Sequence, residues 1–186
     1  MWLLKTSPLL YRRGLKSYSA ARRAEPTIVV INGHPDPRPE RFCAGLCQAF
    51  VEGALAERQK ADVVTIGAIS GTGFKEANDL VRRADRAALI FPLWLDGPPP
   101  IVSRFFEHFA GGECTAHVFV TMAMPAFAHR SLHHPQRGNQ RASRILPSGV
   151  RASALTFIGS IDTLTGAQRQ SWLDKVQRLG KARSRQ

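Results

Sequence analysis

Five short apolar runs, each followed by a segment with helical character, constrain the fold of this chain more than any other feature. The first run, TIVVIN (27–32), is a continuous β-branched run bounded by glycine, as strands buried on both faces of a sheet are. The five runs cover 27–32, 62–67, 87–92, 117–123 and 152–159. Because strands and helices alternate, we expect an α/β protein whose single parallel sheet carries helices on both faces.

The segments between the runs show the spacing of amphipathic helices. In 41–58 one helical stripe holds Phe42, Leu46, Ala49, Phe50 and Ala54. Further helices are predicted over 75–85, 100–109, near 139–146 and over 166–180, with Gly180 as the stop signal of the last one. Two strand orders compete at this length, the dinucleotide-binding order and the order 2-1-3-4-5. In both of them ligands bind beyond the carboxyl ends of the strands.

The first loop at those carboxyl ends, GHPDPRPERF (33–42), is longer than a strand-to-helix turn requires. It leads into the amino end of a helix, where free backbone amides and the helix dipole favour an anion. His34 and Arg41 flank this position, although His34 could equally serve to fix its own turn. Neither G-x-G-x-x-G nor a Walker loop is present, so the usual nucleotide fingerprints are absent.

Two further loops complete the same edge. FPLWLDGPPP (91–100) places Trp94 where a strand ends, and TMAMPAFAHR (121–130) combines small residues with an aromatic and a basic pair. A tryptophan beside prolines is more often a packing residue, but its position at a strand end favours a role in binding. Loops suited to a phosphate and to a flat ring together indicate a mononucleotide-type cofactor.

The first 25 residues differ from the rest in composition. Of the net charge of +12, they contribute six basic residues and one acid, which leaves +7 for residues 26–186. An Arg- and Ser-rich segment without acids until its end is typical of a mitochondrial transit peptide, and equally of an untargeted basic extension. We therefore expect residues 1–25 to form an extension or targeting peptide, without a strand or helix continuous with the domain at 26–186. The location would be cytoplasmic, or the mitochondrial matrix for a transit peptide.

The remaining charges and the cysteines do not point to another class of site. Basic residues at 130–151 carry no RNA-binding or zinc-finger motif, so we interpret Arg137, Arg141, Arg144 and Arg151 as a solvated face and expect no nucleic-acid partner. The apolar runs are too short to span a bilayer. Cys43, Cys47 and Cys114 are expected to be small hydrophobes in a reducing compartment, and no spacing predicts a metal site.

The motifs come in a fixed order: N-G-H-P-D-P with R-F-C, then F-P-L-W with P-P and F-F, then V-T-M-A-M-P-A-F, and W-L-D-K-V-Q-R-L-G near the end. Over 27–180 this set resembles the flavodoxin-2 family. That family holds the NAD(P)H:quinone oxidoreductases (DT-diaphorase), the modulator of drug activity B and the ancillary reductases of potassium-efflux systems. The resemblance implies a flavodoxin-like three-layer sandwich with a five-stranded parallel sheet in the order 2-1-3-4-5.

The resemblance also implies a function. The chain would be a flavoprotein and oxidoreductase, an NAD(P)H dehydrogenase (quinone) with bound FMN or FAD, and a homodimer. Hydride would pass from NAD(P)H to the flavin and then to a small quinone at the same place, in a ping-pong sequence.

The resemblance implies three groups of cofactor residues. At the phosphate these are His34, Arg41, Phe42 and Cys43. Along the ring, with amides facing its polar edge, they are Pro92, Leu93, Trp94 and Leu95, and on the other side they are Thr121, Met122, Ala123 and Met124. His129, in place of a family tyrosine, would be the catalytic residue and, with Arg130, would offset negative charge during turnover.

Several positions depart from the family pattern. Arg38 and Arg41 stand where many relatives carry serine, and cations there still suit a phosphate. Ala123 replaces a common glycine, which would cost about 1 kcal/mol if the position needs positive φ. The spans 67–75 and 109–117 are shorter than in typical relatives, where insertions cover the cofactor and build the dimer. A second reading therefore stays open: a catalytically degenerate flavodoxin-like domain that regulates or binds a partner.

Overall fold

A computed structural model describes residues 15–18, 27–70, 73–94, 97–107, 114–125, 146–147 and 149–182 of the chain. Of the helix expected near 139–146, only Leu146 falls within these ranges. The elements are β1 Leu15–Tyr18, β2 Thr27–Asn32, α1 Phe42–Ala56, β3 Lys60–Thr65, the one-turn 3₁₀ helix η2 Ile66–Ala68, α2 Gly73–Arg83, β4 Arg86–Pro92, α3 Pro100–Glu107, β5 Cys114–Thr121, β6 Val150–Ile158 and α6 Gly166–Lys181.

The strands form one sheet in the order β1-β3-β2-β4-β5-β6. The five strands from β2 to β6 are parallel to their neighbours. Counted from β2, their order is 2-1-3-4-5, so the predicted flavodoxin-like sheet is confirmed. The two central strands β2 and β4 are almost entirely buried, as their continuous apolar runs predicted.

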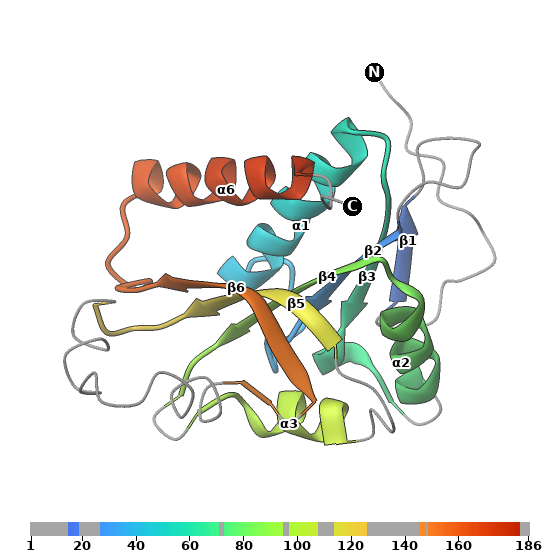
Figure 1. Cartoon of the computed structure of the whole chain (residues 1–186). Coiled ribbons are helices and arrows are strands. Elements are labelled where there is room, and N and C mark those ends of the chain that lie inside the picture. Colours follow the sequence, from blue (N-terminus) through green and yellow to red (C-terminus); the bar gives the residue numbers. More distant parts are fainter. Residues whose placement is uncertain are drawn as a thin grey trace.

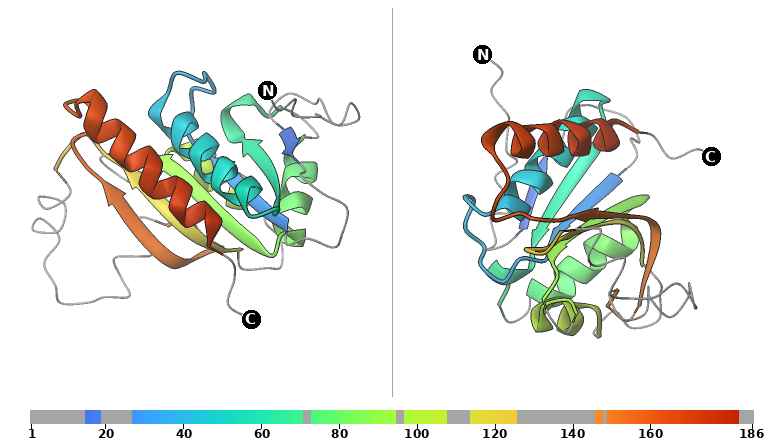
Figure 2. Two further views of the ribbon diagram at one scale, coloured as in Figure 1. Left: turned by 90° about the horizontal axis from the view of Figure 1, so that it is seen from above. Right: turned by 90° about the vertical axis from the view of Figure 1, so that its left-hand side faces the viewer.

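Helices cover both faces of this sheet and make the fold a three-layer sandwich. Figures 1 and 2 show α1 and α6 above the sheet and α3 below it, with α2 on the lower right in Figure 1. One core lies under α1 and α6 and the other lies against α2 and α3, with alternate residues of β2 contributing to each. In the described part of the chain, no helix is both long and apolar enough to cross a membrane.

Helices α1 and α6 approach each other closely through two glycines. A Cβ atom on Gly53 would overlap the carbonyl oxygen of Gln177, and one on Gly180 would overlap the carbonyl oxygen of Phe50. The prediction that Gly180 ends the last helix is wrong, because α6 continues to Lys181. Gly180 is needed for the contact with α1 rather than for a helix stop.

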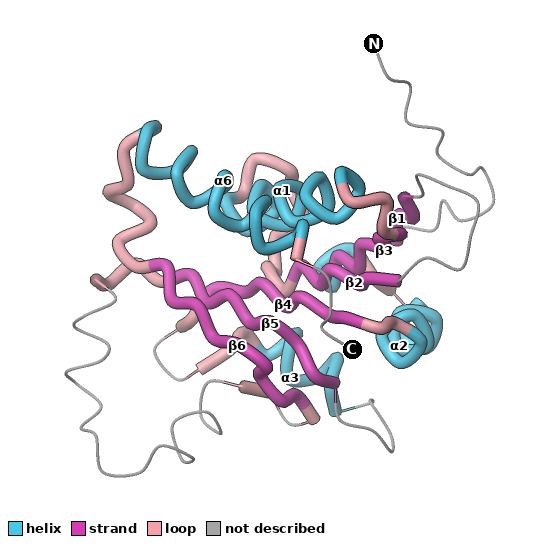
Figure 3. Tube along the Cα trace, turned by 45° about the horizontal axis from the view of Figure 1, so that its top comes forward, coloured by secondary structure: helices cyan, strands magenta, loops and turns pink. Residues whose placement is uncertain are grey.

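The extension contributes a strand that the sequence analysis did not expect. Leu15–Tyr18 form β1, which pairs antiparallel with Ala61–Val64 of β3 and adds a sixth strand to the sheet. Figure 3 shows β1 beside β3 at the edge of the sheet. The expectation that residues 1–25 hold no strand continuous with the domain is therefore wrong.

Candidate functional site

Hydrogen bonds join the predicted loops at the carboxyl ends of β2, β4 and β5. The amide of Gly33 donates to the carbonyl of Ile90 at 2.8 Å, and the amide of Leu93 donates to the carbonyl of Thr121 at 2.7 Å. Cys43, in the first turn of α1, places its Sγ 3.4 Å from Oγ1 of Thr121. The first loop, the second loop and the end of β5 therefore lie together, as the strand order requires.

His34 holds the turn that follows β2. Its amide donates to Oδ1 of Asn32 at 3.1 Å, and its ring Nδ1 accepts the amide of Asp36 at 3.0 Å. Partial burial lowers the pKa of His34, so the neutral ring that accepts this bond is favoured. The residue fixes its own turn through Nδ1, which was one of the two roles that the sequence left open.

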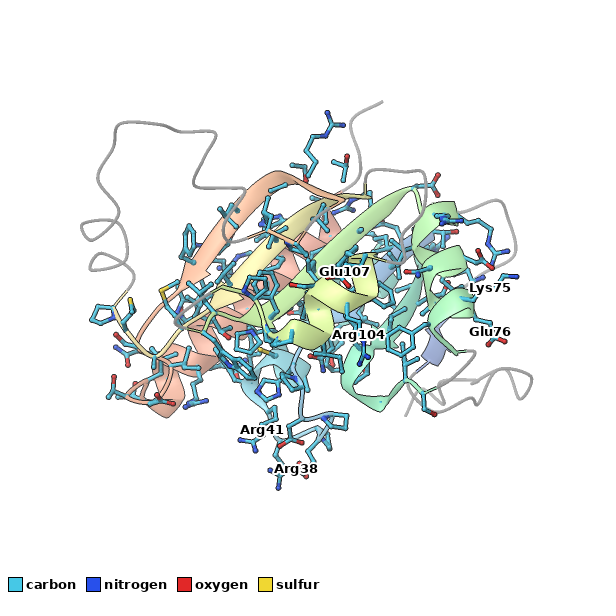
Figure 4. The ribbon with its side chains drawn as sticks, turned by 90° about the horizontal axis from the view of Figure 1, so that it is seen from below. Arg38, Arg41, Lys75, Glu76, Arg104 and Glu107 are labelled. Carbon is cyan, nitrogen blue, oxygen red and sulfur yellow. The ribbon has the colours of Figure 1, made fainter. Side chains whose placement is uncertain are left out.

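Asp36 binds both arginines of the first loop. Nε of Arg38 lies 2.9 Å and Nε of Arg41 lies 2.6 Å from Oδ2 of Asp36. These two guanidinium groups, Arg38 first, hold the pKa of Asp36 well below its usual range. Figure 4 shows Arg38 and Arg41 together, directed away from the body of the protein. With Glu40 included, the loop carries two acids and two arginines and is formally neutral.

The amino end of α1 supplies backbone donors. Arg41 is the N-cap residue in an extended conformation, and no side chain caps this end of the helix. The amides of Ala44 and Gly45 donate to the carbonyl of Arg41, whereas those of Phe42 and Cys43 have no backbone carbonyl as acceptor in the described part of the chain. Two free amides at the positive end of a 15-residue helix are a donor set that fits a phosphate group.

Two large apolar side chains lie exposed at the ends of neighbouring strands. Trp94 follows β4 and is 52% exposed, and Met124 follows β5 and is 36% exposed. They are the exposed large hydrophobic side chains recorded among the described residues, and both lie at the carboxyl edge of the sheet. An apolar surface of this kind fits one face of a flat aromatic ring.

Backbone amides are not free along the start of the second loop. The amide of Leu93 bonds to Thr121, and that of Trp94 donates to the carbonyl of Gly97 at 2.9 Å. The expectation that these two amides face the polar edge of a ring is therefore not met in this conformation. Pro92 is buried at the end of β4, and Leu95 lies outside the described residues.

The third loop is fixed to the segment that follows β6. Met122 donates to the carbonyl of Ile158 at 2.9 Å and accepts the amide of Ile161 at 3.2 Å, while the amide of Ser160 donates to the carbonyl of Met124 at 3.0 Å. The side chains of Thr121 and Met122 are buried, so Ala123 and Met124 are the exposed members of this loop.

Ala123 does not have the backbone strain that a glycine position would impose. Among the described residues, only Arg58 and Ser160 combine a side chain with positive φ. His129 and Arg130 lie outside the described part of the chain.

Sequence reasoning missed Asp36 and the segment 159–165. Nothing in the motif marks Asp36 as the partner of two arginines, because that pairing depends on the path of the turn. The segment after β6 could have been found, since β6 ends at the same edge as the other parallel strands. It is held by Arg169 of α6, whose Nη2 donates to the carbonyl of Ile161 at 2.6 Å.

No protein-family model matches the chain, and no curated protein matches it. Solved structures do resemble it. A protein of Streptococcus mutans UA159 is 20% identical, with a TM-score of 0.61 over 83% of this chain and 98% of that one. An NAD(P)H:quinone oxidoreductase from Methanothermobacter marburgensis is 17% identical, with a TM-score of 0.64 over 85% and 96%. An azoreductase from Bacillus anthracis str. Sterne is 9% identical, with a TM-score of 0.56 over 84% and 99%. The chain therefore has the flavodoxin-like fold of these structures, which include a quinone oxidoreductase and an azoreductase.

Proposed function

We propose that this protein is a flavin-dependent NAD(P)H oxidoreductase that reduces a quinone. The observation that carries the proposal is the exposed pair Trp94 and Met124 at the same sheet edge as the uncapped amino end of α1. An apolar surface near free amides suits a ligand with a flat ring and a phosphate. The names of the structural neighbours, a quinone oxidoreductase and an azoreductase, agree with such a ligand.

The proposed roles follow from the contacts. The amides of Phe42 and Cys43 hold the phosphate of FMN or FAD, beside Arg41 and His34. The side chains of Trp94 and Met124 cover the ring, and the remaining residues that the family resemblance implies support these two loops. A bound flavin would supply the two-electron hydride chemistry between NAD(P)H and a quinone. His129 and Arg130 would offset negative charge at the open side. We also propose that the protein forms a homodimer.

A partner-binding or regulatory role is the second candidate. The connection from β3 to α2 consists of η2 and a few residues, which leaves little chain to cover a ligand. The same exposed Trp94 would then contact another protein, because exposed aromatic residues are common at interfaces.

Flavin titration separates these two candidates. We expect the purified protein to show the visible absorption of oxidised flavin, or to gain it when FMN or FAD is added. Trp94→Phe keeps an aromatic surface and should retain most of the affinity, whereas Trp94→Ala should lose about tenfold, as stacking of about 1–3 kcal/mol predicts. Failure to bind either flavin would reject the proposal and favour the regulatory role.

Kinetics test the reaction itself. If NAD(P)H and quinone use the same exposed surface in turn, double-reciprocal plots should give parallel lines. Intersecting lines would reject the shared surface. A flavin-loaded protein without any turnover would support the degenerate reading.

A further inference from the structure

Arg169, in the first turn of α6, connects segments that lie far apart in the chain. Its Nη2 donates to the carbonyl of Ile161 at 2.6 Å, and its Nε donates to the carbonyl of Leu164 at 3.4 Å. Its guanidinium carbon also lies 5.2 Å from the ring centroid of Phe42, within the range of a cation–π interaction. Arg169 therefore contacts both the segment after β6 and the first residue of α1.

Each of these two contacts leads to one end of the proposed flavin site. Ser160 and Ile161 donate to the carbonyls of Met124 and Met122, so the segment held by Arg169 in turn holds the third loop. Phe42 is the first residue of α1, and its amide is one of the free donors at the phosphate end. One guanidinium group therefore contacts a residue at the phosphate end and also the segment that holds the loop at the ring end.

The local structure fixes the positions of Arg169 and of the segment that it binds. Thr165 and Gln168 form a reciprocal capping box that fixes where α6 begins, and with it the origin of the Arg169 side chain. Ser160 adopts positive φ of 56°, so the segment that it belongs to follows a path that few side-chain residues take. Two charge-assisted hydrogen bonds to backbone carbonyls hold the segment at that path.

We propose that Arg169 is a positioning residue that sets the distance between the phosphate-binding end of α1 and the ring-binding loop 121–124. This inference rests on the proposed function, because it concerns how a flavin is held. A ligand that reaches both ends gains affinity only if both are at the right separation, as in any two-point attachment. Riboflavin reaches the ring end alone, whereas FMN reaches both.

The test compares FMN with riboflavin in matched variants. Arg169→Met keeps the aliphatic stem but removes both donors and the charge, and Arg169→Lys keeps the charge without the planar fork. Arg178→Met is the control, since Arg178 is an exposed arginine near the other end of the same helix. Thermal melting and circular dichroism verify that each variant is folded.

We expect Arg169→Met to weaken FMN binding about tenfold while riboflavin binding changes less than about twofold, so that the preference for the phosphate is lost. Arg169→Lys should lie between this variant and the wild type, and Arg178→Met should match the wild type. Phe42→Leu should show the same selective loss of FMN affinity through the other half of the connection.

The outcomes distinguish the two proposals. Equal losses for FMN and riboflavin would give Arg169 a purely structural role and overturn the inference while leaving flavin binding intact. A wild-type protein that binds riboflavin and FMN with equal affinity would also overturn it, because no phosphate would then be held. A folded wild-type protein that binds no flavin would reject the proposed function and this inference with it.

Discussion

At the scale of single residues, Arg41 supplies one of the two positive charges of the first loop. Nη2 of its guanidinium lies 2.5 Å from Oδ2 of Asp36, so the positive charge of Arg41 is partly neutralised before any ligand binds. Arg41→Glu would place a carboxylate beside Asp36 and at the free amides of α1. We expect FMN affinity to fall by at least about tenfold, because a like charge then faces the phosphate. Lys75→Glu makes the same charge change on α2, well away from Arg41 in Figure 4, and should leave the affinity unchanged. Equal effects of the two substitutions would contradict the assignment of the loop.

The two cysteines of α1 give a prediction about pH. Burial raises the pKa of Cys43 to about 11 and raises that of Cys47 well above its usual value of 9.0. Because the thiolate is the reactive form, both thiols of a Cys114→Ser variant should react with a disulfide reagent only as fast as the fold opens.

The same burial predicts how stability depends on pH. Between pH 9.0 and about 11 the unfolded Cys43 thiol binds fewer protons than the folded one, so the free energy of unfolding should fall as the pH rises through this range. Rapid reaction of the folded variant at neutral pH would contradict this burial.

Strand-end position accounts for what the sequence predicted at the site. Trp94 and Met124 are exposed at the edge where parallel strands end, so their location followed from the order of the strands. The pairing of Asp36 with two arginines did not follow, because it depends on where long side chains settle in a turn. The engaged amides of Leu93 and Trp94 also depend on the local path of the loop, which apolar periodicity does not encode.

At the scale of elements, the contact between α1 and α6 depends on glycine. Gly53→Ala would drive a methyl group into the carbonyl of Gln177, and overpacking of this kind costs about 1–3 kcal/mol. Gly45→Ala on the same helix is the matched control, because its Cβ would lie 3.6 Å from Leu173 in ordinary contact. Since alanine favours a helix over glycine by up to about 1 kcal/mol, Gly45→Ala should be neutral or stabilising. Denaturant unfolding measures both variants, and equal stabilities would contradict the close approach of the helices.

The helices and strands differ in how far the sequence determined them. Strands β2 and β4 were predicted nearly at their observed bounds, because continuous apolar runs of this length have few alternatives in a buried sheet. Gly180 was misread, because a glycine that admits a neighbouring helix looks the same in sequence as one that ends a helix. Strand β1 was missed, because its pairing partner β3 lies more than 40 residues away and its basic surroundings indicated an extension or a targeting peptide.

At the scale of the whole molecule, β1 changes what the extension is expected to do. A segment without a strand continuous with the domain, as the sequence predicts for residues 1–25, would be dispensable for folding. However, Leu15–Tyr18 cover the edge of β3, and an uncovered edge strand exposes a row of backbone donors and acceptors. We now propose that the folded domain includes β1, and that any processing that preserves stability leaves residue 15 in place.

Two shortened chains test this proposal. A chain that begins at Gly14 keeps β1 and should melt within about 2 °C of the full length, a shift worth less than about 1 kcal/mol. A chain that begins at Pro26 loses the four pairs with β3. A few backbone hydrogen bonds at an exposed edge contribute about 1–2 kcal/mol in total, so its melting temperature should fall by about 2–8 °C. The uncovered β3 edge should also increase the tendency to self-associate, which light scattering measures. If the two shortened chains melt together and remain equally monodisperse, β1 is not part of the stable domain and residues 1–25 form a separate extension.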